Sequence, residues 1–499
     1  MHRQFSSARP RLFTVSIAAS LLLVLVCYAW FISYGRWTNW PTRTTYYDQL
    51  ATAFQHHHLA LELQPDPLLL ALTNPYNPAK RGDSKYLLDV SLYAGKYYLY
   101  FGPVPALMLI PLKMAGAGVL GDELLVFAMT VGVFLAQSAL IVSLWKHFFR
   151  AVPAWLVPLC LLCAGLVSPW AWMLTGARVY EAAGAGAQFF FLLGLWMILT
   201  ALVTSPRSLG WFAGAGLAWA LALGSRLTQI FPVASFCLLI AIFFLMEYRR
   251  TREFASCALP VISLALPLML GVGLLGWYNQ ARFGSPFETG FSYQLTLGYM
   301  QKHLHELFSP VYILPNLYDY LLATPGRQPG FPFLRILQGS GLTLFPFLRL
   351  PEIYNTGSLL GLLCSTPFIL FAGLPVAALG FKKTAPQTEA ARELNWFTVG
   401  LLAASLAGLA SLVAFFFSAM RYTADILPPL MLLAILGFWQ GERLLAPQPG
   451  FRRLYLAAGI GLMLFSITVS TLAVFSIRTE DFQALNPTLW AQLTQIFPW

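Results

Sequence analysis

Apolar segments about as long as a bilayer is thick recur along this sequence, and this feature limits its fold more than any other. A helix needs about 20 predominantly apolar residues to cross the hydrocarbon core of a membrane. Of the 499 residues, 58% are hydrophobic and 10% are charged, whereas soluble domains are about 25% charged. The sequence therefore predicts an all-α integral membrane protein and excludes a soluble enzyme. We expect about eleven transmembrane helices: 12–34, 123–147, 151–175, 182–204, 209–225, 228–246, 258–280, 357–381, 396–418, 423–441 and 452–476.

Basic residues indicate the orientation of these helices, because cytoplasmic loops are enriched in Lys and Arg. Segment 102–121 is apolar but contains three prolines and Lys113. If it lies in the interface instead of spanning, fifteen Lys and Arg residues are cytoplasmic and three, Arg178, Arg226 and Arg421, lie in the short loops opposite. The fifteen are Arg3, Arg9, Arg11, Lys146, Arg150, Arg207, Arg249, Arg250, Arg252, Lys382, Lys383, Arg392, Arg443, Arg452 and Arg453. This asymmetry favours the interfacial placement.

The same asymmetry divides the chain into a cytoplasmic leader, spanning helices and two long extracytoplasmic loops. The first helix is expected to be retained, because no small-residue cleavage site follows it. The predicted parts are 1–11, the leader; 12–34, the first transmembrane helix; 35–122, a loop with amphipathic and interfacial helices; 123–280, transmembrane helices 2–7; 281–356, the second long loop; 357–476, transmembrane helices 8–11; and 477–499, an extracytoplasmic tail.

Asp48 and Asp89, both in the first long loop, are the candidate catalytic acids. Asp48 precedes a stretch, 49–63, whose apolar residues favour an amphipathic helix lying on the membrane. At that place an Asp either caps the helix or acts as a general base. Asp89 lies in a tyrosine-rich stretch that predicts a short hairpin or an extended segment. It is either a buried, hydrogen-bonded acid or a substrate contact.

Cationic residues at the extracytoplasmic ends of the helices are candidate phosphate ligands. Lys96 and its neighbours in the first loop suit an anionic partner such as a phosphate or a lipid head group, although a solvated surface explains them equally well. Arg226 has no acid near it in the sequence and needs an anion, which is Glu181, Asp425 or a ligand phosphate. Arg282 follows the seventh predicted helix on the same side.

Two acid–base pairs are predicted at outer helix ends. Arg178 and Glu181 are three residues apart, and Arg421 and Asp425 are four apart, so the members of each pair can meet on a helix. Each pair is then either an internal ion pair or part of a substrate site. Ionisable residues at a membrane boundary are functional candidates, because they are costly there unless they are paired or hydrated.

Three other features do not indicate a ligand. Consecutive helical side chains point about 100° apart, so the three histidines 56–58 are expected to form an interfacial polar patch rather than a zinc site. Cys160 and Cys163 have the spacing of a metal or redox motif but lie in an apolar helix, and no structural disulfide is expected. Basic residues stand in ones, twos and threes between apolar segments, which excludes nucleic acid as a partner.

Several short elements resemble the GT-C superfamily of membrane glycosyltransferases. They are Tyr46-Tyr47-Asp48-Gln49-Leu50-Ala51, Asp89 with Gly95-Lys96-Tyr97-Tyr98, Arg178 through Glu181, and Arg421-Tyr422 with Asp425. A cytoplasmic N-terminus, a first span and a long outer loop with an early acid are similar to the arrangement in that superfamily. Within it, the chain looks most similar to bacterial members and to the aminoarabinose and protein-mannosyl transferase branch.

The resemblance implies inverting transfer of a sugar from a polyprenyl-phosphate donor to a lipid, glycan or protein acceptor, on the extracytoplasmic face of a bacterial inner or plasma membrane. It makes Asp48 the base and implies four phosphate ligands: Lys96, Arg226, Arg282 and Arg421. Many relatives have two adjacent acids after the first span, whereas Tyr47 precedes Asp48 here. Whether Asp48 is the only base, and whether a divalent metal takes part, therefore stay open.

A polytopic transporter or flippase for a lipid-linked or anionic substrate is the alternative. A carrier would place ionisable residues in the middle of its spans and break its helices with paired Gly and Pro. In this sequence the ionisable residues gather at helix ends and the centres of the spans are nearly uncharged, which favours the enzyme. The expected partners are a polyprenyl-phosphate-linked sugar and membrane lipids.

Overall fold

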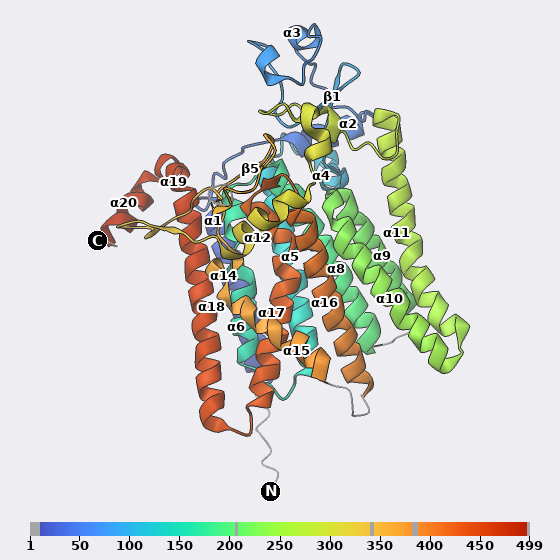
Figure 1. Ribbon diagram of the computed structural model, residues 1–499, viewed down its shortest axis with the longest axis vertical. Coiled ribbons are helices and arrows are strands. Elements are labelled where there is room, and N and C mark those ends of the chain that lie inside the picture. The colour runs from blue at the N-terminus through green and yellow to red at the C-terminus, as the bar shows by residue number, and fades with distance from the viewer. Residues whose placement is uncertain (1–9, 205–207, 340–343, 382–387, 497–499) are drawn as a thin grey trace.

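The computed structural model describes residues 10–204, 208–339, 344–381 and 388–496. Long helices run side by side through the height of the molecule in Figure 1, and the two long polar loops gather at its upper end. We call this end, formed by the described parts of 35–122 and 281–356, the loop end. Five of the cations that indicated the orientation lie outside the described residues: Arg3, Arg9, Arg207, Lys382 and Lys383.

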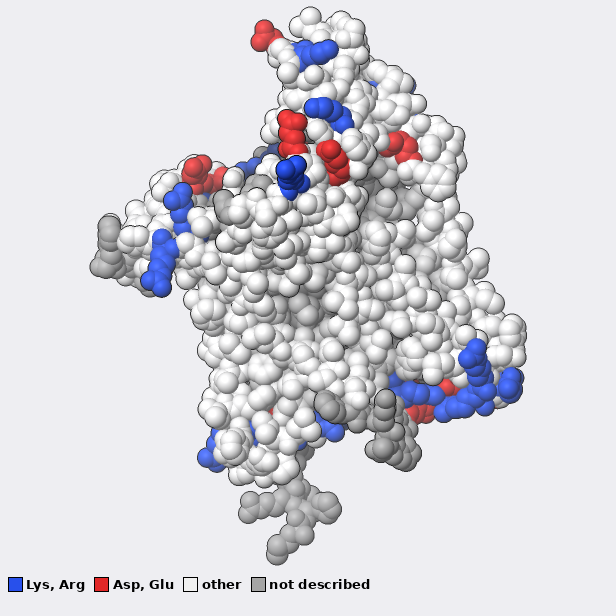
Figure 2. Space-filling view, in the orientation of Figure 1, with Lys and Arg blue, Asp and Glu red and all other residues white. Residues whose placement is uncertain are grey.

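Within the described ranges, eight helices are long and apolar enough to cross a membrane. They are α1 (Pro10–Ile32), α5 (Asp122–Phe148), α6 with α7 (Leu156–Leu166 and Trp170–Thr175), α8 (Val179–Thr204), η2 with α10 (Leu227–Gln229 and Ile230–Thr251), α11 (Phe254–Phe283), α16 (Glu389–Val413) and α18 (Pro449–Ile477). Charged side chains gather toward two ends of the face shown in Figure 2, with a nearly uncharged belt between them. The prediction of an all-α integral membrane protein is confirmed.

Two further predicted spans are helical, one with the predicted bounds and one shifted toward the C-terminus. The span 209–225 is α9 (Leu209–Ser225), which packs against α8 and α11. The span 423–441 is α17 (Leu427–Leu444), and nearly all of its side chains are buried. A helix buried on all sides by other helices is apolar all round, which is why α17 has the composition of a lipid-facing span.

The span predicted over 357–381 is not one helix. Its first residues follow β5 (Asn355–Thr356), and the apolar stretch is divided into α14 (Leu362–Ser365), η6 (Pro367–Ala372) and α15 (Gly373–Phe381). Pro367 begins η6, and a proline disfavours helical geometry in the residue before it. The span over 151–175 is likewise interrupted between α6 and α7, where Pro169 precedes the second helix. Hydrophobicity alone therefore overestimated the continuity of these two segments.

α16 begins earlier than the predicted 396–418, at Glu389. Its first turns contain charged residues, which made them look like a loop in the sequence. In the structure Arg392 Nη1 lies 2.7 Å from Glu247 Oε2 of α10, and α16 packs along α10. The ion pair joins two helix ends, so the charges of this segment are part of the helical structure.

The segment 102–121 forms only a short helix, α4 (Val104–Met114). At 1.5 Å per residue, its 11 residues extend about half the thickness of the hydrocarbon core, so α4 does not cross it. α4 lies at the loop end (Figure 1) and packs against α2 (Tyr46–Gln55). α2 ends well before the predicted residue 63, and its Leu50 is fully buried, so it is a packed helix rather than one lying on a membrane surface.

A β-hairpin follows Asp89, as the tyrosine-rich stretch predicted. β1 (Ser91–Tyr93) and β2 (Lys96–Tyr98) pair antiparallel. Their two-residue turn, Ala94-Gly95, has positive φ angles of 47° and 73°, the conformation that favours glycine in such hairpins. The hairpin holds the start of β1 next to the second long loop, where Ser91 forms a bridge to Gln294.

Short elements form the rest of the described chain. They are α3 (Pro67–Leu70), η1 (Pro78–Lys80), η3 (Phe291–Tyr293), η4 (Met300–Glu306), η5 (Pro310–Tyr312), α12 (Ile313–Leu322), β3 (Gly326–Arg327), β4 (Leu334–Arg335), β6 (Phe417–Ser418), η7 (Met420–Asp425), α19 (Thr479–Leu485) and α20 (Pro487–Ile496). β3 pairs antiparallel with β4, and β5 pairs parallel with β6. The strand pair β5–β6 and the turn η7 bring the chain between α16 and α17 to the loop end.

Candidate functional site

A cavity of about 340 Å³ lies where the helix ends meet the long loops. Its walls come from residues 100–103, the start of α8, the junction of α9 with η2, the end of α11, the second long loop and the segment from α16 to η7. Three of the predicted phosphate ligands line it: Arg226, Arg282 and Arg421. Among the described residues that line the cavity, none is Asp or Glu.

Arg226 lies at the end of α9, where its φ of −152° takes the chain out of the helix. Its Nη2 is 3.4 Å from Asp425 Oδ2, and its guanidinium lies over the ring of Tyr422, 4.9 Å from the centroid. Asp425 is buried and also accepts a hydrogen bond from Gln229 Nε2 at 3.1 Å. Of the anions considered for Arg226, the structure supplies Asp425.

Arg282 lies in the last turn of α11 and is nearly buried. Its Nη1 donates to the carbonyl oxygen of Leu99 at 2.7 Å, and its Nη2 donates to Asn279 Oδ1 at 2.7 Å. The guanidinium stacks on Tyr278, 3.8 Å from the ring centroid. These contacts orient Arg282 with neutral partners, and no carboxylate of the described residues forms an ion pair with it.

Arg421 lies in η7 among aromatic rings. Its guanidinium carbon is 4.9 Å from the ring centroid of Tyr180, 5.1 Å from that of Tyr422 and 5.7 Å from that of Phe417. Within the described part of the chain Arg421 forms no ion pair, so the pair with Asp425 that the spacing allowed is not formed. Arg421 therefore presents a positive charge to the cavity, and the buried carboxylate of Glu181 interacts with it electrostatically from behind.

Asp89 does not line the cavity but is hydrogen-bonded to a residue that does. Its Oδ2 accepts a hydrogen bond from the hydroxyl of Tyr180, a residue that lines the cavity, and its Oδ1 accepts one from Gln294 Nε2 at 3.2 Å. Burial raises the pKa of the Asp89 carboxyl above its ordinary value, while the hydrogen bond from Tyr180 and the positive charge of Arg421 oppose that rise. Asp89 is thus both a buried, hydrogen-bonded acid and a neighbour of the cavity.

Asp48 lies in the first turn of α2, apart from the residues that line the cavity. Its Oδ1 is 2.8 Å from Lys113 Nζ of α4 and accepts a hydrogen bond from the backbone N–H of Leu120 at 3.1 Å. The N-cap of α2 is Thr45, so Asp48 is not the helix cap that its position suggested. Its contacts are those of a residue that joins α2 to α4.

Asp122 performs the capping role that the sequence suggested for Asp48. Its carboxylate accepts hydrogen bonds from the backbone N–H groups of Tyr46 and Tyr47, at 3.2 and 3.1 Å, and from the hydroxyl of Thr44 at 2.6 Å. Thr44 in turn accepts a hydrogen bond from the backbone N–H of Val179 at 2.9 Å. One buried acid therefore connects the start of α2 to the start of α8. An acid directly before an apolar span was the signal that could have identified it.

Glu181, Arg178 and Lys96 lie away from the cavity surface. Glu181 is buried, and its Oε2 has no hydrogen-bond partner among the described residues. Arg178 is exposed and, within the described ranges, does not form the predicted ion pair with Glu181. Lys96 is exposed beside the hairpin turn. The structure therefore brings together Arg226, Arg282 and Arg421, with Asp89, Glu181 and Asp425 set behind the surface.

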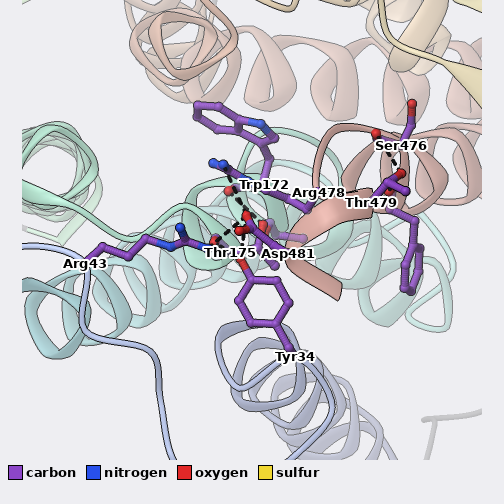
Figure 3. A network of polar contacts seen from close by, with 10 residues as sticks. Tyr34, Arg43, Trp172, Thr175, Ser476, Arg478, Thr479 and Asp481 are labelled. Atoms are coloured by element: carbon purple, nitrogen blue, oxygen red, sulfur yellow. Dashed lines mark hydrogen bonds and ion pairs between the residues drawn. The ribbon is translucent and has the colours of Figure 1, made fainter. Parts of the chain in front are cut away.

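A second polar network, absent from the sequence predictions, lies beside α1 and α7 (Figure 3). Arg43 Nη2 is 2.9 Å from Asp481 Oδ2, and Arg478 Nη1 is 3.7 Å from the same oxygen. Tyr34 accepts a hydrogen bond from Arg43 at 2.8 Å and donates one to the carbonyl oxygen of Thr175. The network joins the start of α19 to the chain that follows α1, which makes it a tie between distant segments.

The described residues contain no group of three or more His, Cys, Asp or Glu side chains placed to hold a metal ion. His56 and His58 both approach Glu62 Oε1, at 2.7 and 3.3 Å, and the backbone φ of His57 is +62°. Cys160 and Cys163 are both buried.

Comparison with known proteins gives matches of structure but not of sequence. No protein-family model matches the sequence, and no curated protein matches it. The archaeal oligosaccharyltransferase AglB from Archaeoglobus fulgidus, solved with an inhibitory peptide and a dolichol-phosphate, is similar with a TM-score of 0.45 and 11% identity, over 92% of this chain and 55% of AglB. The apo form of the oligosaccharyltransferase from the same organism gives a TM-score of 0.42 and 12% identity, over 92% of this chain and 56% of that one.

ArnT from Cupriavidus metallidurans, bound to undecaprenyl phosphate, is similar with a TM-score of 0.41 and 12% identity, over 96% of this chain and 78% of ArnT. The chain thus spans about half the length of the oligosaccharyltransferase that it matches.

Proposed function

We propose that this protein is a membrane glycosyltransferase that moves a sugar from a polyprenyl-phosphate donor to an acceptor, with inversion, on the extracytoplasmic side of a bacterial inner membrane. The observation that carries the proposal is the cavity at the loop end, with three arginines and no acid among its described lining residues. A cavity of this kind fits an anionic ligand whose negative charge increases during the reaction. Because positively charged loops mark the cytoplasmic side, Arg249 and Arg250 at the far end of α10 support this orientation.

The arginines suit a phosphate leaving group. A guanidinium presents a planar set of donors that matches two phosphate oxygens, and a positive charge stabilises the negative charge that develops as the sugar–phosphate bond breaks. Among the described residues neither Arg282 nor Arg421 forms an ion pair, so a phosphate would displace no carboxylate bound to either of them. Arg226 already has Asp425 at 3.4 Å, so its charge reaches a ligand only in part.

An apolar wall suits the polyprenyl chain. Leu223, Leu227, Phe231 and Leu275 line the cavity from α9, η2, α10 and α11. Leu227 and Phe231 expose 53% and 48% of their surface and lie among helices that face lipid. An apolar tail therefore has a path from the bilayer to the arginines, as a lipid-linked donor requires.

Asp89 is the acid that we assign as the general base. An inverting transfer needs one step, in which the acceptor oxygen attacks the anomeric carbon on the face opposite the phosphate and a base takes the acceptor proton. Asp89 connects to the cavity through Tyr180, whereas Asp48 binds Lys113 outside it. The raised pKa of the Asp89 carboxyl makes it a stronger base than an exposed Asp.

Binding of undecaprenyl phosphate to the purified protein in detergent tests the site. We expect binding of undecaprenyl phosphate and not of undecaprenol, which has the same tail without the charge. Arg421→Gln should weaken this binding about 10-fold or more, because a hydrogen bond to a charged group contributes about 1.5–3 kcal/mol. Arg250→Gln, an exposed arginine at the other end of the bundle, is the matched control and should bind normally. Equal binding of the alcohol and the phosphate would refute the site.

Transfer itself is tested with labelled lipid-linked sugars extracted from bacterial membranes. A transferase releases polyprenyl phosphate and moves the label to a new product, and Arg421→Gln should remove this activity. A carrier reconstituted in vesicles would move the labelled lipid across the bilayer without forming any product. Label that crosses the bilayer and stays on the donor would therefore replace the proposed activity by transport.

A further inference from the structure

We propose that Tyr180 is a catalytic residue that passes the acceptor's proton to Asp89. The proposal rests on the transferase activity proposed above and assigns a further residue to it. Asp89 is not among the residues that line the cavity, but Tyr180 is. Since the Tyr180 hydroxyl donates its hydrogen to Asp89 Oδ2, a substrate in the cavity reaches this oxygen of the base through the phenol.

The carboxylate of Asp89 is held in one orientation. Its second oxygen accepts the hydrogen bond from Gln294, and its backbone N–H donates to the carbonyl oxygen of Leu295 at 2.8 Å. The backbone N–H of Leu295 donates back to the carbonyl oxygen of Val90 at 3.0 Å. With one oxygen bound by Gln294, Oδ2 is directed to Tyr180, and Gln294 acts as a positioning residue.

Tyr180 is also held in place from several sides. It lies in the first turn of α8, whose starting residue Val179 is bound to Thr44. Its ring packs edge-on against Phe101, with the centroids 5.7 Å apart, and Arg421 lies over the same ring at 4.9 Å. A cation next to the ring stabilises negative charge that develops on the phenol oxygen while two protons move.

The proton transfer balances without any other reagent. The acceptor oxygen bonds to the anomeric carbon while the carbon–oxygen bond to the phosphate breaks, and its electron pair leaves with the phosphate. The acceptor proton moves to the phenol oxygen of Tyr180, and the phenol's own proton moves to Asp89 Oδ2. The charge lost by the carboxylate appears on the phosphate, near Arg226, Arg282 and Arg421. Asp89 returns its proton to solvent after the product has left.

The test is the variant Tyr180→Phe, which keeps the ring that contacts Phe101 and Arg421 and removes only the hydroxyl. We expect kcat to fall about 100-fold or more, the size of a general-base contribution, with the affinity for undecaprenyl phosphate unchanged within two-fold. Asp89→Asn should cause a similar loss, and the double variant should lose little more, because both residues serve one proton path. Tyr76→Phe, which removes a phenol bonded to the Leu92 carbonyl outside the cavity lining, is the control and should keep full activity.

The pH profile separates a proton carrier from a structural tyrosine. The titratable and charged groups that face Asp89 are Tyr46 of α2, Tyr100 after β2, Tyr180 of α8 and Arg421 of η7. In the wild type, kcat should fall as the pH drops through the raised pKa of the Asp89 carboxyl, because the protonated acid accepts nothing. In Tyr180→Phe the remaining activity should no longer show this fall at low pH, which is the acid limb of the pH profile.

The outcomes distinguish this proposal from the one on which it rests. An active wild type with an equally active Tyr180→Phe variant overturns the role of Tyr180 and leaves the transferase intact. The role is also overturned if Tyr180→Phe retains the acid limb, or if its loss appears in undecaprenyl phosphate affinity with kcat unchanged. A wild type that binds undecaprenyl phosphate and transfers no sugar overturns the transferase, and the role of Tyr180 with it.

Discussion

The ion pair between Asp48 and Lys113 allows the two roles of Asp48 to be separated by experiment. Lys113 Nζ lies 2.8 Å from Asp48 Oδ1, and the two side chains are 11% and 6% exposed. The pair joins α2 to α4, and Asp48 also binds the backbone N–H of Leu120 beyond α4. If these contacts are the whole role of Asp48, its charge matters for stability and not for transfer.

The expected cost of breaking the pair is about 3 kcal/mol, because removal of one partner leaves the other charge buried and uncompensated. Asp48→Asn keeps an oxygen for the Leu120 N–H but leaves the ammonium of Lys113 without its anionic partner. Lys113→Met leaves the carboxylate of Asp48 without its cationic partner instead. The double variant has neither charge and keeps the apolar stem at 113, so it should lose at most about 1–2 kcal/mol, well short of the sum of the single losses.

Denaturant titration of the purified variants in detergent measures these free energies of unfolding. Sugar transfer by the double variant then tests catalysis on a folded protein. We expect near-wild-type transfer. A double variant that is as stable as the wild type but about 100-fold slower would show that Asp48 is the base, and would refute the reasoning that assigns the base to Asp89.

Three further predictions follow from particular contacts. Arg226→Gln should destabilise the protein by about 3 kcal/mol, because it leaves Asp425 buried without its cation, and Asp425→Asn in the same chain should recover most of that loss in a denaturant titration. Cysteines placed at Lys96 and at Arg250, both exposed, should react with an impermeant thiol reagent only at 96 in intact cells, and the reverse pattern would invert the orientation. Gly102→Val should lower the thermal stability in detergent, because a Cβ at this position would overlap the backbone of α9; an unchanged melting temperature would contradict this packing.

The sequence predicted the fold well because the length of an apolar segment is a local property. The first helix and the helices over 123–147 and 452–476 needed only a count of apolar residues. Prediction failed where tertiary structure decides, as in 357–381, where glycines and Pro367 divide an apolar stretch into short helices. It also failed at the start of α16, whose Arg392 has its partner on α10.

Three of the residues that line the cavity were candidates from the sequence, but their contacts were not predicted. Arg226, Arg282 and Arg421 were identified because a cation next to an apolar span is costly without a partner or a function. Their partners are set by distances across the fold: Asp425 bonds to Arg226 from another helix rather than to its sequence neighbour Arg421. Tyr180 was not singled out, because an aromatic residue at the end of a span has the ordinary composition of a membrane interface.

The layering of charge explains how one cavity can attract a phosphate and still contain acids nearby. Each acid is set one layer back: Asp425 behind Arg226, held by Gln229, and Asp89 behind Tyr180. The surface that a ligand meets therefore presents arginines, and at short range in a poorly screened site a carboxylate on that surface would repel the phosphate. Because the proposed base is behind a neutral phenol, it can accept a proton while the surface charge that would hold the proposed phosphate stays positive. The arrangement thus separates anion binding from proton transfer by one side chain.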